Sequence, residues 1–230
     1  MEFIVLLIIV VIMYFILGFI FDFNMKKIKK IGEDKELDEL TQKYPENIEI
    51  CKWYLKRLKN ENVKIEEDKT SNSTLYLVMS NKIFIADLKE SYTRIQTIAH
   101  ECLHSIQSKK LLWFNFVFSN IYLVYFLVIC VLGILKVLPI KMTFLAIFIL
   151  LSLVYYAVRT YLENDAMIKA RFLAKEYMQE KAISTQLEID KIIAQYDCLN
   201  DIGIKCTNFK FLSNILLKIS ILIVIFGYWM

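Results

Sequence analysis

The pentapeptide His100-Glu101-Cys102-Leu103-His104 contains the only two histidines among the 230 residues of this chain. In a helix, residues four positions apart lie one above the other on the same face. Two imidazoles in this arrangement can bind one zinc ion, and the glutamate beside the first can act as general base on a metal-bound water. The motif therefore predicts a catalytic zinc site with His100 and His104 as ligands and Glu101 as the base.

A catalytic zinc ion usually has three protein ligands and one open position. No third histidine exists, so the remaining ligand must be a carboxylate or a cysteine. The segment Glu163-Asn164-Asp165-Ala166 is the best candidate. The chain enters a predicted membrane hairpin after His104 and returns to the same side of the membrane just before Glu163. We predict that Glu163 is the third ligand and that Asp165 orients a ligand histidine through its other ring nitrogen. Two alternatives stay open here, namely Asp165 as the ligand and a merely solvated acidic helix start.

The helix that must position the motif is predicted over residues 91–108. Its apolar residues share one face at helical spacing, and they are Ile95, Ile98, Ala99, Cys102, Leu103 and Ile106. His100, His104 and Gln107 fall on a different, more polar face. Cys102 could suggest a thiol nucleophile, but its place on the apolar side predicts that it packs as a small hydrophobic residue.

The composition predicts an integral membrane protein, since 57% of the residues are hydrophobic and they gather in blocks. Residues 3–21 are long enough to span a bilayer. A signal peptide is the rival interpretation, but the run lacks a basic flank and a cleavage site. Residues 111–158 form a predicted transmembrane hairpin. Residues 211–229 contain Lys218, so we expect either a fourth span or an interfacial helix.

Lysine and arginine residues concentrate on one side of these predicted spans, which predicts their orientation. The N-terminus is expected outside and residues 24–110 and 159–210 in the cytoplasm, with the active site on the cytoplasmic face of a bacterial membrane. The five cysteines form no C-x-x-C pair, so we expect reduced thiols. Basic and acidic residues are interleaved, which argues against nucleic acid as a partner. The expected partners are the lipid bilayer and membrane-associated protein or peptide substrates.

Between the first span and the motif, the sequence predicts helices over residues 33–44 and 46–59 and strands over residues 74–79 and 82–86. The two strands form a hairpin directly ahead of the motif helix. It could receive an extended substrate by strand addition, or it could merely cover the helix. The predicted fold is therefore a mainly α membrane protein with about four transmembrane helices and a cytoplasmic zincin-like region that contains a small β-hairpin.

The segments Ile98–Gln107 and Glu163–Ala166 resemble those of the YugP-like neutral zinc metallopeptidases of bacterial membranes. That family has an H-E-x-G-H-A-I-Q-like segment, a membrane hairpin and then an E-x-D-A segment. The resemblance implies zinc bound by His100, His104 and Glu163, with Glu101 as the catalytic base. Leu103 departs from the pattern, because the family usually has glycine there, and this puts substrate fit in doubt more than metal binding.

The membrane zinc peptidases of the HtpX and CAAX-processing type are a second, less similar family. Their later acidic segment usually continues with aspartate where this chain has Met167. The function expected from the residues and the resemblance is a membrane-embedded zinc metalloendopeptidase of the H-E-x-x-H…E type. The alternatives are a catalytically silent, zinc-braced membrane sensor and a structural membrane protein without metal.

Overall fold

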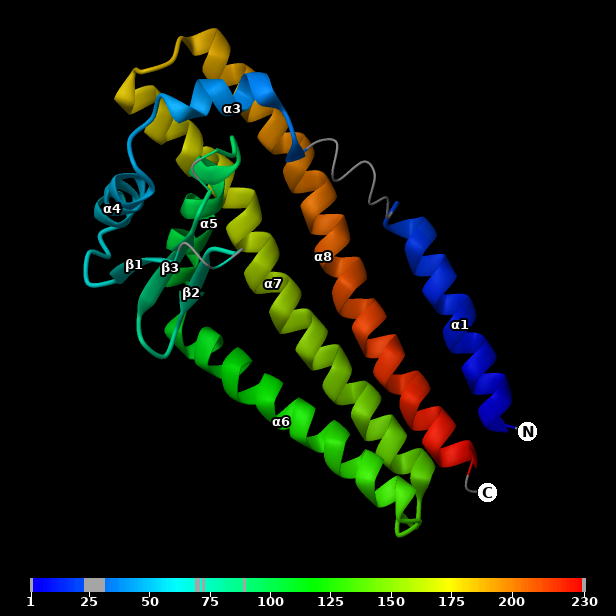
Figure 1. Ribbon diagram of the computed structural model, residues 1–230. Coiled ribbons are helices and arrows are strands. Elements are labelled where there is room, and N and C mark those ends of the chain that lie inside the picture. Colours follow the sequence, from blue (N-terminus) through cyan, green and yellow to red (C-terminus); the bar gives the residue numbers. More distant parts are fainter. Residues whose placement is uncertain (1, 23–31, 69–70, 72, 89, 229–230) are drawn as a thin grey trace. The chain divides into compact units, whose positions relative to one another are not determined.

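The computed structural model describes residues 2–22, 32–68, 71, 73–88 and 90–228 (Figure 1). This part of the chain is mainly helical and includes a small three-stranded sheet. It forms two compact units. Unit 1 contains Met1–Phe23, Trp113–Tyr161 and Lys205–Met230, and unit 2 contains Asn24–Leu112 and Leu162–Ile204.

The described part of the chain contains four helices long and apolar enough to cross a membrane, as predicted. They are α1 (Glu2–Ile20), α6 (Lys109–Ile134), α7 (Lys141–Lys181) and α8 (Gln186–Tyr228). α7 and α8 differ from the prediction because each continues without a break between its polar and apolar parts. α7 contains neither glycine nor proline, so nothing ends the helix where its composition changes from apolar to charged.

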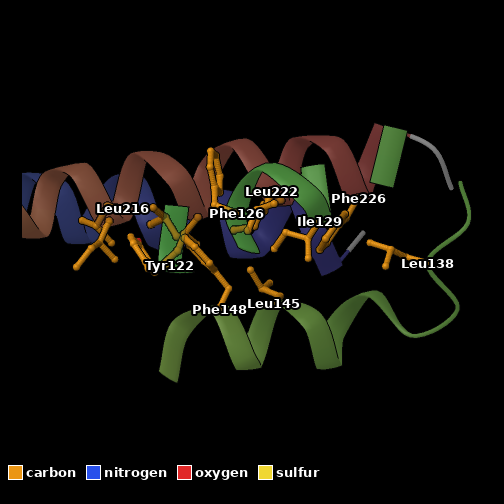
Figure 2. Packing of buried hydrophobic residues seen from close by; sticks show 13 residues of the cluster. Tyr122, Phe126, Ile129, Leu138, Leu145, Phe148, Leu216, Leu222 and Phe226 are labelled. Carbon is orange, nitrogen blue, oxygen red and sulfur yellow. The ribbon is translucent and has the colours of Figure 1, made fainter. Parts of the chain in front are cut away.

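Unit 1 has a core of aromatic and branched side chains contributed by all four helices. Figure 2 shows Tyr122 and Phe126 of α6 close to Phe148 of α7, and Leu222 and Phe226 of α8 in the same cluster. The Tyr122 and Phe148 rings stack with their centroids 5.1 Å apart. In lipid, such close packing is what associates helices, because burial of apolar surface gives little driving force there.

Unit 2 is built around a sheet with strand order β1-β3-β2. β2 (Leu75–Leu77) and β3 (Lys82–Ala86) pair antiparallel, as the predicted hairpin requires, and Asn81 takes the positive φ of 48° in the turn. β1 (Lys64–Asp68) pairs parallel to β3 and was not predicted. Its sequence KIEED lacks the alternating apolar residues that indicate a strand, because neither of its faces is fully buried.

The helices predicted over residues 33–44, 46–59 and 91–108 are all present among the described residues of unit 2. They are α3 (Lys35–Gln42), α4 (Asn47–Arg57) and α5 (Arg94–Ile106). The side chains on the predicted apolar face of α5 are buried with one exception, since Ile106 is 46% exposed at the end of the helix. Cys102 is fully buried, and its Sγ lies 3.6 Å from Sγ of Cys51 on α4. It therefore packs as a small hydrophobic residue.

Arg94 begins α5 and is fully buried. Its guanidinium donates hydrogen bonds to the carbonyl oxygens of Thr41, Tyr44 and Pro45 and to Oδ1 of Asn47. The turn between α3 and α4 is therefore joined to the first turn of the helix that carries the motif. A buried arginine so placed satisfies backbone acceptors that would otherwise have no partner.

Changing Arg94 to methionine is expected to destabilise the protein by about 3 kcal/mol, because the buried carbonyls lose a charged donor. Chemical denaturation followed by circular dichroism measures the change. The matched substitution Arg57→Met removes an exposed arginine that pairs with Glu176, and it should leave the midpoint nearly unchanged. Equal midpoints for the two variants would contradict this role for Arg94.

Candidate metal centre

His100 and His104 lie one turn apart on α5, with their Nε2 atoms 3.0 Å apart. The rings are nearly perpendicular, at an interplanar angle of 89°. Their side chains are 16% and 13% exposed, so both are largely buried but not closed off from the surface. Two imidazole nitrogens that converge from one helix face form half of a zinc coordination shell.

Glu163 lies in α7, and its carboxylate completes a triangle with the two imidazoles. Its Oε2 is 3.6 Å from Nε2 of His100 and 3.7 Å from Nε2 of His104. Zinc bonds of about 2.0–2.2 Å in tetrahedral geometry separate neighbouring ligand atoms by roughly 3.3–3.6 Å. The three edges of 3.0, 3.6 and 3.7 Å lie within about 0.3 Å of that range, so small side-chain adjustments would let these donors hold a zinc ion.

Glu101 lies beside this triangle and is buried. The potential ligand atoms of His100, Glu101 and His104 are all within 4.8 Å of one another. Oε2 of Glu101 accepts a hydrogen bond of 2.7 Å from the backbone N–H of Tyr76 in β2, and Oε1 lies 3.9 Å from Nε2 of His100. One carboxylate oxygen is thus anchored, and the other is left on the histidine side.

Both Glu101 and Glu163 could in principle be the third ligand, and their contacts distinguish them. One oxygen of Glu163 is almost equidistant from both histidine nitrogens, whereas Glu101 has Oε2 bound by the Tyr76 amide and only Oε1 near His100, at 3.9 Å. The Asp165 carboxylate is engaged elsewhere, by Nζ of Lys169 at 2.5 Å and Nε2 of Gln107 at 3.1 Å. The geometry therefore favours Glu163 as the ligand and leaves Glu101 available as a base.

Gln107 connects His104 to α7, the helix of Glu163. Its Nε2 donates to the carbonyl oxygen of Leu162 at 2.9 Å and to Oδ2 of Asp165. These two acceptors set the orientation of the amide, so Oε1 faces Nδ1 of His104 at 2.9 Å. The proton of His104 then resides on Nδ1, and Nε2 keeps the lone pair that a metal needs.

Asp165 was predicted to contact a ligand histidine directly. In the structure the contact is indirect, because Gln107 lies between Asp165 and His104. Gln107 could have been identified from the sequence, since it follows His104 by three positions and must lie near that ring on a helix. The Tyr76 amide could not have been identified, because a backbone donor leaves no trace in residue type.

The charges of the site shift the pKa values of its carboxylates in opposite directions. Burial raises the pKa of Glu101 above its ordinary value, and the nearby histidines only partly counter this. Burial also acts to raise the pKa of Glu163, but hydrogen bonding and charge from His100 and His104 outweigh it, so the net pKa is well below the usual range. Glu163 is therefore an ionised carboxylate suited to a cation, and Glu101 is the stronger base.

Changing Gln107 to alanine is expected to weaken zinc binding by about 10- to 100-fold, the usual cost of removing a partner that orients a ligand histidine. Competition with a chromogenic chelator measures the affinity. Gln42→Ala, at an exposed position of α3, provides the matched control. Unchanged affinity in the Gln107 variant would show that this amide does not orient His104.

Comparison of the chain with protein-family models, with curated proteins and with solved structures found no match.

Proposed function

We propose that the chain is a membrane-embedded zinc metalloendopeptidase. The observation that carries this proposal is the triangle of His100 Nε2, His104 Nε2 and Glu163 Oε2, with the unligated carboxylate of Glu101 beside it. A purely structural zinc site prefers four closed ligands, often cysteines. Three donors, an adjacent buried base and partial exposure are what a hydrolytic zinc site requires.

Zinc at this site would supply Lewis acidity toward water and a peptide carbonyl. The chain's own contribution begins with Glu101, whose Oε1 accepts the proton of the attacking water. The Tyr76 amide keeps the other oxygen of Glu101 in place, so the base does not have to reorient during the reaction. Glu101 then delivers that proton to the leaving amine nitrogen.

His104 contributes orientation as well as a ligand atom, because Gln107 fixes its tautomer. The β2 strand lies at the edge of the sheet and is tied to Glu101 through Tyr76. An extended substrate that added to this edge would place its backbone beside the base. That β2 receives a substrate in this way, instead of only covering α5, stays a prediction.

The proposed substrates are membrane-associated proteins or peptides, and the proposed active site faces the cytoplasm. The cytoplasmic side is proposed from the concentration of lysine and arginine on one side of the predicted spans. The membrane-associated substrates are proposed from the chain order. α6 begins at Lys109, five positions after His104, and Glu163 follows the predicted end of the preceding span, Val158, by five positions in one continuous helix. The five residues from Val158 to Glu163 rise by about 8 Å along α7, so the proposed ligands lie close in sequence to the membrane-length helices.

One contact favours a second candidate, a zinc-braced membrane sensor without catalysis. The bond from the Tyr76 amide to Glu101 also stabilises β2, so Glu101 could be retained for structure alone. Glutamine can accept the same hydrogen bond through its Oε1 but cannot take a proton from water. Glu101→Gln therefore separates the two candidate functions without removing the contact.

The cellular test compares the proteomes of cells that contain the wild-type protein with those of cells that contain Glu101→Gln. The peptidase account predicts uncut membrane-associated proteins that accumulate with the variant and shorten with the wild type. Matching proteomes, together with normal zinc content in both proteins, would favour the sensor.

A further inference from the structure

Two cations in unit 1, Arg159 and Lys218, have no acidic partner among the described residues. The sequence of unit 1 contains only two carboxylate residues, Glu2 and Asp22, and they flank the two ends of α1. The same unit contains Lys136, Lys141, Arg159, Lys205, Lys210 and Lys218. The unit therefore has a positive charge that its own carboxylates cannot neutralise.

Lys218 lies within the apolar part of α8, and its ammonium is surrounded by aromatic rings. Its Nζ is 4.6 Å from the ring centroid of Tyr122, 5.8 Å from that of Phe126 and 5.9 Å from that of Tyr155. The electron-rich faces of these rings attract the cation. Cation–π contacts leave its formal charge in place, so the ammonium can still bind an anion or a carbonyl oxygen.

Arg159 belongs to the same aromatic cluster. Its guanidinium carbon lies 5.3 Å from the ring centroid of Phe211, which contacts the Tyr155 ring edge-to-face at 6.4 Å. Tyr155 in turn stacks on Tyr122 at 4.8 Å, so the rings run continuously from one cation to the other. Nε of Arg159 is buried and has no hydrogen-bond partner in the described chain, which marks a donor that lacks its acceptor.

Lys218 lies deeper in the apolar sequence than Arg159, as the residues that each contacts show. Arg159 follows the last residue of the predicted span, whereas Tyr155, which contacts Lys218, lies four residues further into the apolar segment. Four helical residues correspond to about 6 Å along the axis. A phospholipid presents its phosphate at the membrane surface and its ester carbonyls several ångströms deeper.

We propose that Arg159 and Lys218 form a binding site for the headgroup of an anionic phospholipid, with the guanidinium on the phosphate and the ammonium at the ester carbonyls. The site is separate from the candidate metal centre and does not depend on the proposed hydrolysis. Basic groups between transmembrane helices are the usual means by which proteins bind anionic headgroups.

The test uses the full-length protein in vesicles of phosphatidylcholine with a minor fraction of phosphatidylglycerol. Native mass spectrometry then measures which lipids the solubilised protein retains. Wild type should retain phosphatidylglycerol in preference to phosphatidylcholine. The double variant Arg159→Gln/Lys218→Met should lose this preference by about 10- to 30-fold, from roughly 1 kcal/mol for each cation.

The matched control is Lys210→Met, which removes an exposed charge from α8, the helix that also contains Lys218. This variant should retain the lipid like wild type. An equal loss in this control would overturn the proposal in favour of diffuse charge attraction, as would undiminished retention by the double variant. Displacement of the lipid by inorganic phosphate would show a site for a free anion instead. If the double variant loses its helical circular dichroism, Arg159→Gln alone decides, with an expected loss of about 5-fold.

Discussion

Replacing Glu101 with glutamine is expected to leave zinc bound and to reduce peptide hydrolysis by about 10²- to 10⁴-fold, the range typical of a lost general base. The proposed ligands His100, His104 and Glu163 are unchanged in this variant, and the Tyr76 amide keeps an acceptor. Only proton transfer is removed. Turnover of a peptide substrate and zinc content, both measured on the purified protein, give the two halves of the prediction.

Glu61→Gln is the matched control, because it makes the same chemical change at an exposed position of unit 2. It should hydrolyse peptide like wild type. Wild-type turnover by Glu101→Gln would remove the assignment of the base. Loss of both zinc and turnover would instead place Glu101 among the ligands. This is the nearest competing geometry, because Oε1 of Glu101 lies on the side of the histidines.

Changing Glu163 to alanine is expected to weaken zinc binding by more than the roughly 100-fold that removal of an orienting partner costs. The reason is that the triangle then has two donors, and zinc sites in proteins require at least three. The same variant should lose peptide hydrolysis at zinc concentrations that saturate the wild type. Isothermal titration with zinc measures the affinity directly.

Glu176→Ala provides the control for this change, since it removes an exposed glutamate from the same helix. Asp165→Ala tests the alternative assignment. Because Asp165 reaches His104 only through Gln107, this change should lower the zinc affinity less than Glu163→Ala does. A larger loss of zinc affinity from Asp165→Ala than from Glu163→Ala would exchange the roles of the two carboxylates.

The placement of the candidate site could be predicted from the sequence because its signals are local or topological. Helical periodicity places His100 and His104 on one face, and a membrane hairpin must return Glu163 to the side from which the chain left. The triangle of donor atoms agrees with that expectation. The four membrane-length helices follow from apolar length alone.

Other features could not be predicted because they depend on tertiary contacts. β1 is a strand only because β3 offers it a partner, and its own residues carry no alternating pattern. The hydrogen bond from Tyr76 to Glu101 depends on where an edge strand meets α5. The continuity of α7 through Val158 reflects the absence of a helix-breaking residue, whereas the prediction followed the change in hydropathy.

X-ray absorption at the zinc edge, on wild-type protein loaded with one equivalent of zinc, identifies the atoms bound to the metal. Zinc held by His100, His104 and Glu163 should show a first shell of nitrogen and oxygen only, at about 2.0–2.2 Å, with the outer-shell scattering of two imidazoles. Glu163→Ala should change that shell, and Glu176→Ala should not. A sulfur ligand at about 2.3 Å, or a shell without two imidazoles, would contradict zinc bound by His100, His104 and Glu163.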